Sequence, residues 1–284
     1  MVEAERLACC PDASIQGLFE ILRKLSLDEF GQLLIGVPEQ FRNLKNLLPR
    51  MASDEVQKNW TGNSGVDLLR QSCAFMRTVE RGWYSHKRAL MLEKKSLRVL
   101  DYGCGWGRLV RLLYYYTQVD CIFGVDAWDQ SIEICRECNL PGKFDLVDYI
   151  PTSLPDGYHS FDLIISFSVF THLSERTMEA VLAVLRNSIM SDGILVATIR
   201  PVEYWGIHQN YPEGYSRERL TERHQRAGFA FMPHNRPPID GEVTYGDTSM
   251  SLEYIARNWN GWHVVGTDYN LVDPYQLVVF LTPV

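Results

Sequence analysis

The stretch that decides the fold is Val99-Leu100-Asp101-Tyr102-Gly103-Cys104-Gly105-Trp106-Gly107-Arg108-Leu109. Its apolar start ending in an acid predicts a buried strand over residues 98–101, and the residues after the glycines predict a helix over about 108–116. Glycine lets the backbone approach a ligand closely, and open α/β sheets hold ligands at the carboxyl ends of their strands. The stretch therefore predicts a ligand-binding turn, although a glycine-rich turn alone does not identify the ligand.

Strand patterns alternate with helical patterns from residue 97 onward, which is typical of parallel βαβ units. The predicted strands cover residues 98–101, 121–126, 144–147, 163–167, 194–200, 262–269 and 275–281. The predicted helices cover about 108–116, 130–137, 175–187 and 252–259. Only residues 270–274 join the last two strands. That connection is too short for a parallel crossover, so we expect these two strands to pair antiparallel.

The residues before this pattern are predicted to be helical. Apolar side chains recur at helical spacing over residues 15–22, Ser26-Leu27-Asp28-Glu29 has the form of a capping box, and a further helix is expected over about 66–83. We expect a helical N-terminal extension or cap over residues 1–95 and an α/β domain over 96–284. Residues 201–248, rich in Pro, Gly, His and aromatics, show little regular periodicity and are expected to form an insertion after the fifth strand that acts as a lid.

Composition limits the classes of function. The chain has 284 residues, 46% of them hydrophobic, and a net charge of −7, which predicts a globular protein and disfavours nucleic acid as a partner. No run approaches the ~20 apolar residues that span a bilayer, and the first residues lack the features of a signal peptide. Seven cysteines at irregular spacing favour a reducing compartment. We expect a cytoplasmic protein without a membrane partner and, because Cys135-x-x-Cys138 has no second ligand pair, without a metal.

Two further acids follow predicted strands. Asp126 ends Ile122-Phe123-Gly124-Val125-Asp126, some twenty residues beyond the glycine turn, where a carboxylate can accept both ribose hydroxyls of a nucleoside. A helix N-cap is the alternative role for Asp126. Asp148 and Tyr149 follow the third strand and suit the edge and face of an adenine ring, with turn capping as the alternative for Asp148.

Together these motifs resemble those of class I S-adenosylmethionine-dependent methyltransferases. Asp101-x-Gly-x-Gly-x-Gly resembles the first motif of that family, Gly124-Val125-Asp126 the second, Asp148-Tyr149 the third and Phe161-Asp162-Leu163-Ile164-Ile165-Ser166 the fourth. The resemblance implies a Rossmann-like seven-stranded sheet, mostly parallel with one antiparallel strand, and S-adenosyl-L-methionine as cofactor. It implies cofactor contacts at Asp101, Gly103, Cys104, Gly105, Asp126, Ala127, Asp148, Tyr149 and Ser166. A nicotinamide-binding domain is the competing interpretation, but its G-x-G-x-x-G fingerprint places the third glycine one residue later.

The acceptor side is less specified. The segment after the fourth strand lacks the Asn/Asp-Pro-Pro-aromatic tetrad that the family uses for amino groups, and it lacks the acids of its metal-dependent members. We predict His172 and His208 as catalytic residues, because a histidine can accept a proton near neutral pH; a backbone-bonded histidine at a helix entry is the alternative for His172. Arg200, Tyr211 and Tyr245 are the predicted substrate contacts.

These features predict an enzyme that methylates a hydroxyl of a small-molecule or saccharide-like acceptor, by histidine-assisted deprotonation or by proximity alone. A non-catalytic S-adenosylmethionine-binding protein with a regulatory or assembly role is the alternative, as is an RNA or protein methyltransferase. The arginines over residues 217–226 alternate with acids and are interpreted as a solvated helix face. The sequence leaves open whether the chain forms a homodimer.

Overall fold

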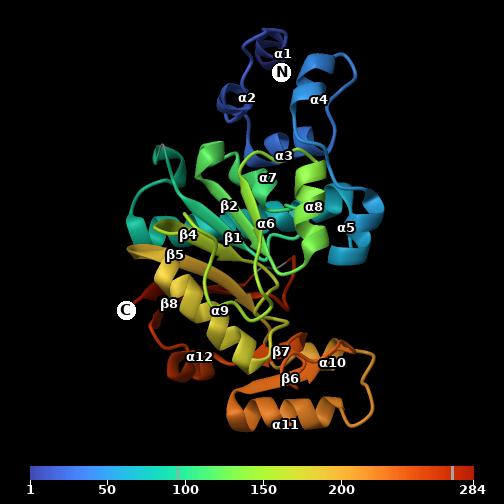
Figure 1. The fold of residues 1–284 in the computed structure, drawn as a ribbon, viewed down its shortest axis with the longest axis vertical. Coiled ribbons are helices and arrows are strands. Elements are labelled where there is room, and N and C mark those ends of the chain that lie inside the picture. Colours follow the sequence, from blue (N-terminus) through green and yellow to red (C-terminus); the bar gives the residue numbers. More distant parts are fainter. Residues whose placement is uncertain (95, 270–271) are drawn as a thin grey trace. The chain divides into compact units, whose positions relative to one another are not determined.

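The computed structural model describes residues 1–94, 96–269 and 272–284, drawn in Figure 1. The chain divides into two compact units, Met1–Leu146 and Val147–Val284. The sequence predicted a different division, with a helical extension over residues 1–95 and an α/β domain over 96–284, and that division stays a prediction.

The first unit begins with helices, as expected. They are α1 (Val2–Ala8), α2 (Ile15–Leu22), α3 (Leu27–Ile35), α4 (Arg42–Leu47), α5 (Asp54–Thr61), α6 (Gly65–Lys87) and the 3-10 helix η1 (Met91–Glu93). The predicted capping box is present, because Ser26 Oγ accepts from the Glu29 amide and the Glu29 carboxylate accepts from the Ser26 amide. Sequence reasoning missed α1, α4 and α5, which have six to eight residues and bury few side chains.

These helices share a core with the residues that follow the glycine turn. The Phe19 ring stacks on the Tyr114 ring with centroids 4.6 Å apart. The Arg23 Nε donates to the Tyr114 carbonyl oxygen at 2.8 Å, and the Tyr115 hydroxyl donates to the Leu25 carbonyl oxygen at 3.1 Å. The helical extension is therefore packed into the first unit.

The strands of the first unit are parallel in the order β3-β2-β1. They are β1 (Val99–Tyr102), β2 (Ile122–Asp126) and β3 (Lys143–Leu146), accompanied by α7 (Val110–Leu113), the 3-10 helix η2 (Val119–Cys121) and α8 (Asp129–Glu137). The helix after the glycine turn is shorter than the predicted 108–116. Gly103, Gly105 and Gly107 all have positive φ, which keeps the chain in turn conformation before the helix can start.

The second unit adds parallel β4 and β5 and a strand inserted antiparallel. Its main elements are β4 (Phe161–Ser166), α9 (Glu175–Ser188), β5 (Ile189–Ile199), α12 (Leu252–Asn258), β8 (Trp262–Tyr269) and β9 (Leu277–Pro283). β9 pairs antiparallel with both β5 and β8, which confirms the antiparallel pairing expected for the last two strands. Their predicted connection, 270–274, includes residues 270 and 271, which lie outside the described residues.

The strand order of the seven-stranded sheet is β3-β2-β1-β4-β5-β9-β8. This is a mixed sheet with β9 as its antiparallel strand, and the predicted fold class is confirmed. Nowhere in residues 1–94, 96–269 and 272–284 does a helix have the length and apolar character needed to cross a membrane.

The insertion after β5 is built of helices and strands. It contains α10 (Tyr204–Ile207), α11 (Arg217–Ala227) and an antiparallel pair formed by β6 (Phe229–Pro233) and β7 (Gly246–Met250); Figure 1 shows α11 beside β6. The sequence of this insertion shows little apolar periodicity because α11 is charged on most of its surface and buries only Leu220 and His224, and its role as a lid stays a prediction. The helix-face interpretation of its arginines is confirmed, since they are exposed on α11.

Candidate cofactor and acceptor sites

The glycine turn is fastened to the end of β2. The backbone amides of Gly103 and Cys104 both donate to the Val125 carbonyl oxygen, at 2.8 and 3.0 Å. Gly105 has φ +53°, and a Cβ placed on it would meet no atom within 4 Å. The turn therefore leaves free space beside its backbone, as a turn that receives a ligand requires.

Asp126 lies at the end of β2 and bonds to this turn. Its Oδ2 accepts from the Gly105 amide at 2.9 Å, and its Oδ1 accepts from the Trp128 amide at 2.9 Å. Burial raises the pKa of Asp126, and these amides oppose that shift. The N-cap of α8 is Trp128, without a side-chain cap, so Asp126 does not serve as the cap that the sequence offered as its alternative. Ala127, between the two, is half-buried.

An aromatic pair from two distant segments lies beside Asp126. The Trp128 ring stacks on the Trp60 ring of α5, with centroids 4.3 Å apart. Trp128 is nevertheless 42% exposed, so the N-terminal helices contribute an aromatic surface next to the predicted ribose carboxylate.

The buried side chain of Asp101 indicates whether the site suits a cationic ligand group. Its side chain is only 2% exposed, and its Oδ2 has no hydrogen-bond partner among the described residues. Burial, and then the charge of Asp126, raises the pKa of Asp101 from 3.8 to about 8. The charge of Arg108 opposes this rise, but a buried carboxyl group with an unused oxygen still lacks a hydrogen-bond donor. The α-ammonium of S-adenosylmethionine has the charge and the donors that this oxygen lacks, so the residues present fit that cofactor.

The remaining predicted cofactor residues belong to the second unit. Asp148 and Tyr149 are exposed in the segment before β4, and Ser166 is fully buried at the end of β4. Their contacts with a cofactor stay predictions.

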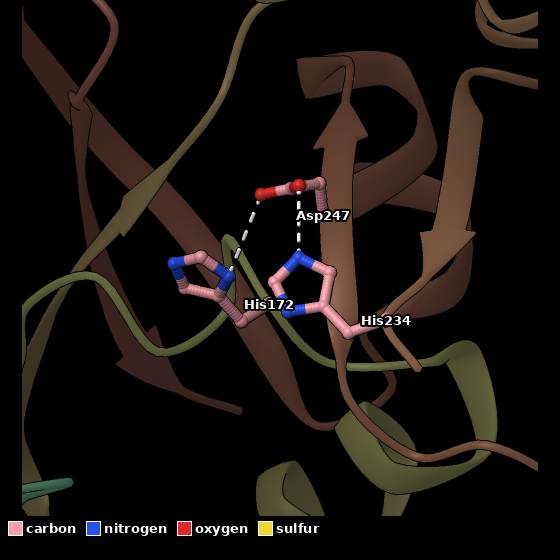
Figure 2. A group of neighbouring side chains, drawn as sticks. All are labelled: His172, His234 and Asp247. Atoms are coloured by element: carbon pink, nitrogen blue, oxygen red, sulfur yellow. Dashed lines mark hydrogen bonds and ion pairs between the residues drawn. The ribbon is translucent and has the colours of Figure 1, made fainter. Parts of the chain in front are cut away.

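Most of the predicted acceptor residues lie around one buried carboxylate, Asp247 of β7, to which the sequence had assigned no role; Tyr211 does not contact it. Asp247 Oδ1 accepts from Arg200 Nη1 at 2.5 Å and from the Tyr204 hydroxyl at 2.9 Å. Its Oδ2 accepts from His234 Nε2 at 3.0 Å. Figure 2 shows the carboxylate of Asp247 with the rings of His172 and His234. Arg200 and His172 follow the carboxyl ends of β5 and β4, where α/β sheets bind ligands.

His172 has both ring nitrogens engaged. Its Nδ1 lies 2.7 Å from the Gly246 carbonyl oxygen, which only accepts, and its Nε2 lies 3.1 Å from Arg200 Nη2, which only donates. The ring is therefore neutral, with the proton on Nδ1. Burial, and then the charge of Arg200, lowers the pKa of His172 from 6.5 to about 3. The backbone bond matches the alternative role named for this histidine, and its role as a base stays a prediction that this geometry does not favour.

The other predicted acceptor residues are also held by internal contacts. The Tyr245 ring stacks on the His172 ring, with centroids 5.0 Å apart. The Tyr211 hydroxyl donates to the Trp205 carbonyl oxygen. His208 Nε2 lies 2.9 Å from the Asn210 carbonyl oxygen, and its Nδ1 lies 3.3 Å from the Tyr204 hydroxyl. His172, Arg200, His208 and Tyr245 thus gather around Asp247, and their functional roles stay predictions.

Three of these side chains also have the spacing of a metal site. One ligand atom from each of His172, His234 and Asp247 lies within 4.8 Å of the others. Arg200, however, already donates to Asp247 and to His172, so a cation here would displace or face a guanidinium charge. We interpret the group as a hydrogen-bonded network.

Comparison with known proteins agrees with the fold and the motifs. Residues 99–193 match the family model described as a methyltransferase domain. A cyclopropane-fatty-acyl-phospholipid synthase of Escherichia coli (strain K12) is 26% identical over 138 residues, covering 45% of this chain and 34% of the synthase. The chain thus spans about a third of the length of that relative.

The solved structures that resemble the fold include the following two. An S-adenosylmethionine-dependent methyltransferase from Clostridium acetobutylicum ATCC 824 aligns with TM-score 0.50 and 11% identity, over 81% of this chain and 96% of that one. The PH0226 protein from Pyrococcus horikoshii OT3 aligns with TM-score 0.53 and 15% identity, over 88% of this chain and 100% of that one.

Fold, motifs and family model agree. Residues 99–193 match a methyltransferase domain, and the seven-stranded sheet has a Rossmann-like fold that resembles the fold of an S-adenosylmethionine-dependent methyltransferase. S-adenosylmethionine is the cofactor that this match and the motifs around Asp101 and Asp126 indicate.

Proposed function

We propose that this protein transfers the methyl group of S-adenosylmethionine to a hydroxyl group of a small-molecule or saccharide-like acceptor. The observation that carries the cofactor half is the unpartnered, buried oxygen of Asp101 beside the glycine turn. The acceptor half is supported by the histidine, tyrosine and arginine side chains that surround Asp247 at the carboxyl ends of β4 and β5. Four buried free cysteines and the absence of disulfides among the described residues support a cytoplasmic location.

The residues of each unit have distinct parts in this proposal. In the first unit, Asp101 accepts from the cofactor ammonium and Asp126 accepts from the ribose hydroxyls, while Gly103, Cys104, Gly105 and Ala127 line the turn. In the second unit, Asp148 and Tyr149 contact the adenine and Ser166 lies at the end of β4. The cofactor supplies a methyl group on a cationic sulfur; the protein orients the acceptor and removes its proton.

A carbon acceptor is the second candidate, because the partial relative from Escherichia coli is a cyclopropane-fatty-acyl-phospholipid synthase. A protein that only binds S-adenosylmethionine is the third. Both differ from the main proposal in what becomes labelled when methyl-labelled cofactor is supplied.

The cofactor half is tested by calorimetric titration of S-adenosylmethionine. Replacing Asp126 by Asn should weaken binding roughly 10- to 100-fold, the value of a hydrogen bond to a charged group. The matched control, Asp129→Asn, changes an exposed acid three residues away and should bind as the parent does. Equal affinities for both variants would contradict the ribose assignment.

The acceptor half is tested by incubation with methyl-labelled cofactor and pools of saccharides, metabolites, lipids, RNA and protein. Label on a saccharide or small-molecule hydroxyl is expected. Label confined to lipid carbon, RNA or protein would overturn the acceptor class, and cofactor binding without any labelled product would favour the binding-only alternative.

A further inference from the structure

We propose that His234, held by Asp247, is the general base that removes the proton from the acceptor hydroxyl. The inference deepens the proposed function and rests on it for the identity of the acceptor. It moves the role of base from His172 and His208 to a histidine that the sequence reasoning had left without a role.

Asp247 is built to stay ionised. Burial raises its pKa, but the hydrogen bond from His234 and the charge of Arg200 outweigh burial and hold the pKa of Asp247 well below its usual range. Its side chain is 6% exposed, and its two oxygens accept from three side chains on different segments. A fixed, buried carboxylate of this kind orients a histidine and stabilises the imidazolium that forms when the histidine takes a proton.

His234 has one ring nitrogen engaged and a side chain that is partly exposed. Its Nε2 faces Asp247 Oδ2 at 3.0 Å, and because a carboxylate only accepts, Nε2 carries the proton. The neutral ring then has its lone pair on Nδ1, which accepts no hydrogen bond from any described residue. The side chain is 39% exposed, and the His234 amide donates to the Tyr245 carbonyl oxygen at 3.1 Å, which fixes the backbone. The side chain is therefore held by Asp247 and remains partly exposed.

The other histidines of the network lack this combination. His172 is 15% exposed, and both of its nitrogens are engaged. His208 is 19% exposed, with one nitrogen facing the Asn210 carbonyl and the other the Tyr204 hydroxyl. To act as a base, His172 would first have to break a hydrogen bond, whereas His208 is held among Asn210, Tyr204 and Asp247 with only 19% of its side chain exposed.

The charged and titratable groups that face His234 come from several segments. Besides Asp247, the rings of His172 and Tyr245 lie 6.1 and 5.5 Å from its ring, and Arg236 stacks on Tyr245. The Asp247 carboxylate that binds His234 also contacts three other side chains, Arg200, Tyr204 and His208.

The step balances. The acceptor hydroxyl gives its proton to His234 Nδ1, and its oxygen forms a bond to the methyl carbon. The carbon–sulfur bond breaks, with its electron pair remaining on sulfur, so that the positive charge lost from the sulfonium appears on the imidazolium beside Asp247. The acceptor is thus of the class that requires deprotonation, an alcohol or phenol, and no metal ion takes part in the step.

The first test reads the tautomer by nitrogen NMR of histidine-labelled protein. At a pH where the ring is neutral, His234 should carry its proton on Nε2. Assignment comes from the signal lost in His234→Gln, whose amide can still donate to Asp247 and so preserve the network. A proton on Nδ1 would overturn the proposal, and this readout needs neither cofactor nor acceptor.

The second test is kinetic, with the acceptor found by labelling. His234→Gln should lower kcat about 100-fold or more, as loss of a general base does, with cofactor affinity and the KM for the acceptor unchanged. His263→Gln, on an exposed position of β8, is the matched control and should behave as the parent. Activity of His234→Gln within threefold of the parent overturns the base assignment. If the parent protein does not bind S-adenosylmethionine at all, that result would instead refute the proposed function.

Discussion

The unpartnered carboxylate of Asp101 makes the stability of the first unit depend on pH in a calculable way. An acid whose pKa is higher in the folded protein stabilises the fold fully below its unfolded-state pKa, and this contribution is lost as the pH rises towards the folded-state value. For Asp101 these values are 3.8 and about 8. Within that window folding binds one proton, so the free energy of unfolding falls by about 1.36 kcal/mol per pH unit.

Asp101→Asn removes this proton linkage. Between pH 5 and pH 7 the variant should gain about 3 kcal/mol relative to the parent, since two pH units each contribute about 1.36 kcal/mol. Urea unfolding of both proteins at the two pH values measures this difference. Asp120→Asn, which changes an exposed acid of η2, is the control and should remain parallel to the parent.

Cofactor binding should change the protonation state of Asp101. When its ammonium pairs with Asp101, the carboxylate ionises, so binding at pH 7 should release close to one proton. Calorimetry in buffers of different ionisation enthalpy detects that proton, and Asp101→Asn should abolish it. Parallel pH dependence of parent and Asp101→Asn, together with cofactor binding that releases no proton in either, would refute the assignment of a neutral, buried Asp101.

Three further predictions concern the second unit, the turn and metal ions. Asp247→Asn should cost about 3–5 kcal/mol in urea unfolding because it leaves Arg200 buried without its carboxylate, whereas Asp240→Asn, in an exposed ion pair, should cost under about 1 kcal/mol. Gly105→Ala should lower stability by about 1 kcal/mol or slightly more, measured by thermal unfolding, because its positive φ strains an L-residue; no change would contradict the φ value. Treatment with a chelator should leave methyl transfer unchanged because Arg200 already occupies the carboxylate, and loss of turnover restored by a metal would contradict the network interpretation.

The fold was largely predictable because its signals are local. The capping box of Ser26 and Glu29 lies within one turn, and the strands before Asp101 and Asp126 are short apolar runs ending in an acid. The strands of the insertion were not predicted, because β7 is polar in sequence yet fully buried. Its side chains are satisfied by distant partners, such as Ser249, which accepts from the Trp205 indole at 2.7 Å.

The candidate site residues likewise differ in whether a local sequence pattern predicts their positions. The places of Asp101 and Asp126 could be predicted because each lies near the end of a predicted strand, and the position in the sheet sets the place of the side chain; their contacts with a cofactor stay predictions. The place of Asp247 could not be predicted, because the groups that bind it come from residues 200, 204 and 234, and no local pattern encodes such a meeting. The preference for His234 over His172 depends on their hydrogen-bond partners. His172 lies between Arg200 and a backbone carbonyl, whereas His234 faces the carboxylate of Asp247. Only the three-dimensional structure shows these contacts.

The position of β9 has a consequence for synthesis on the ribosome. β9 follows both β5 and β8 in sequence but lies between them in the sheet. While the chain is being translated, β5 therefore emerges with an open edge, and β8 emerges before the strand that will pair with it. Open apolar edges recruit other chains, so this half of the protein is most exposed to misassembly before residues 277–283 leave the ribosome. A chaperone that binds nascent strands would be most useful in that interval.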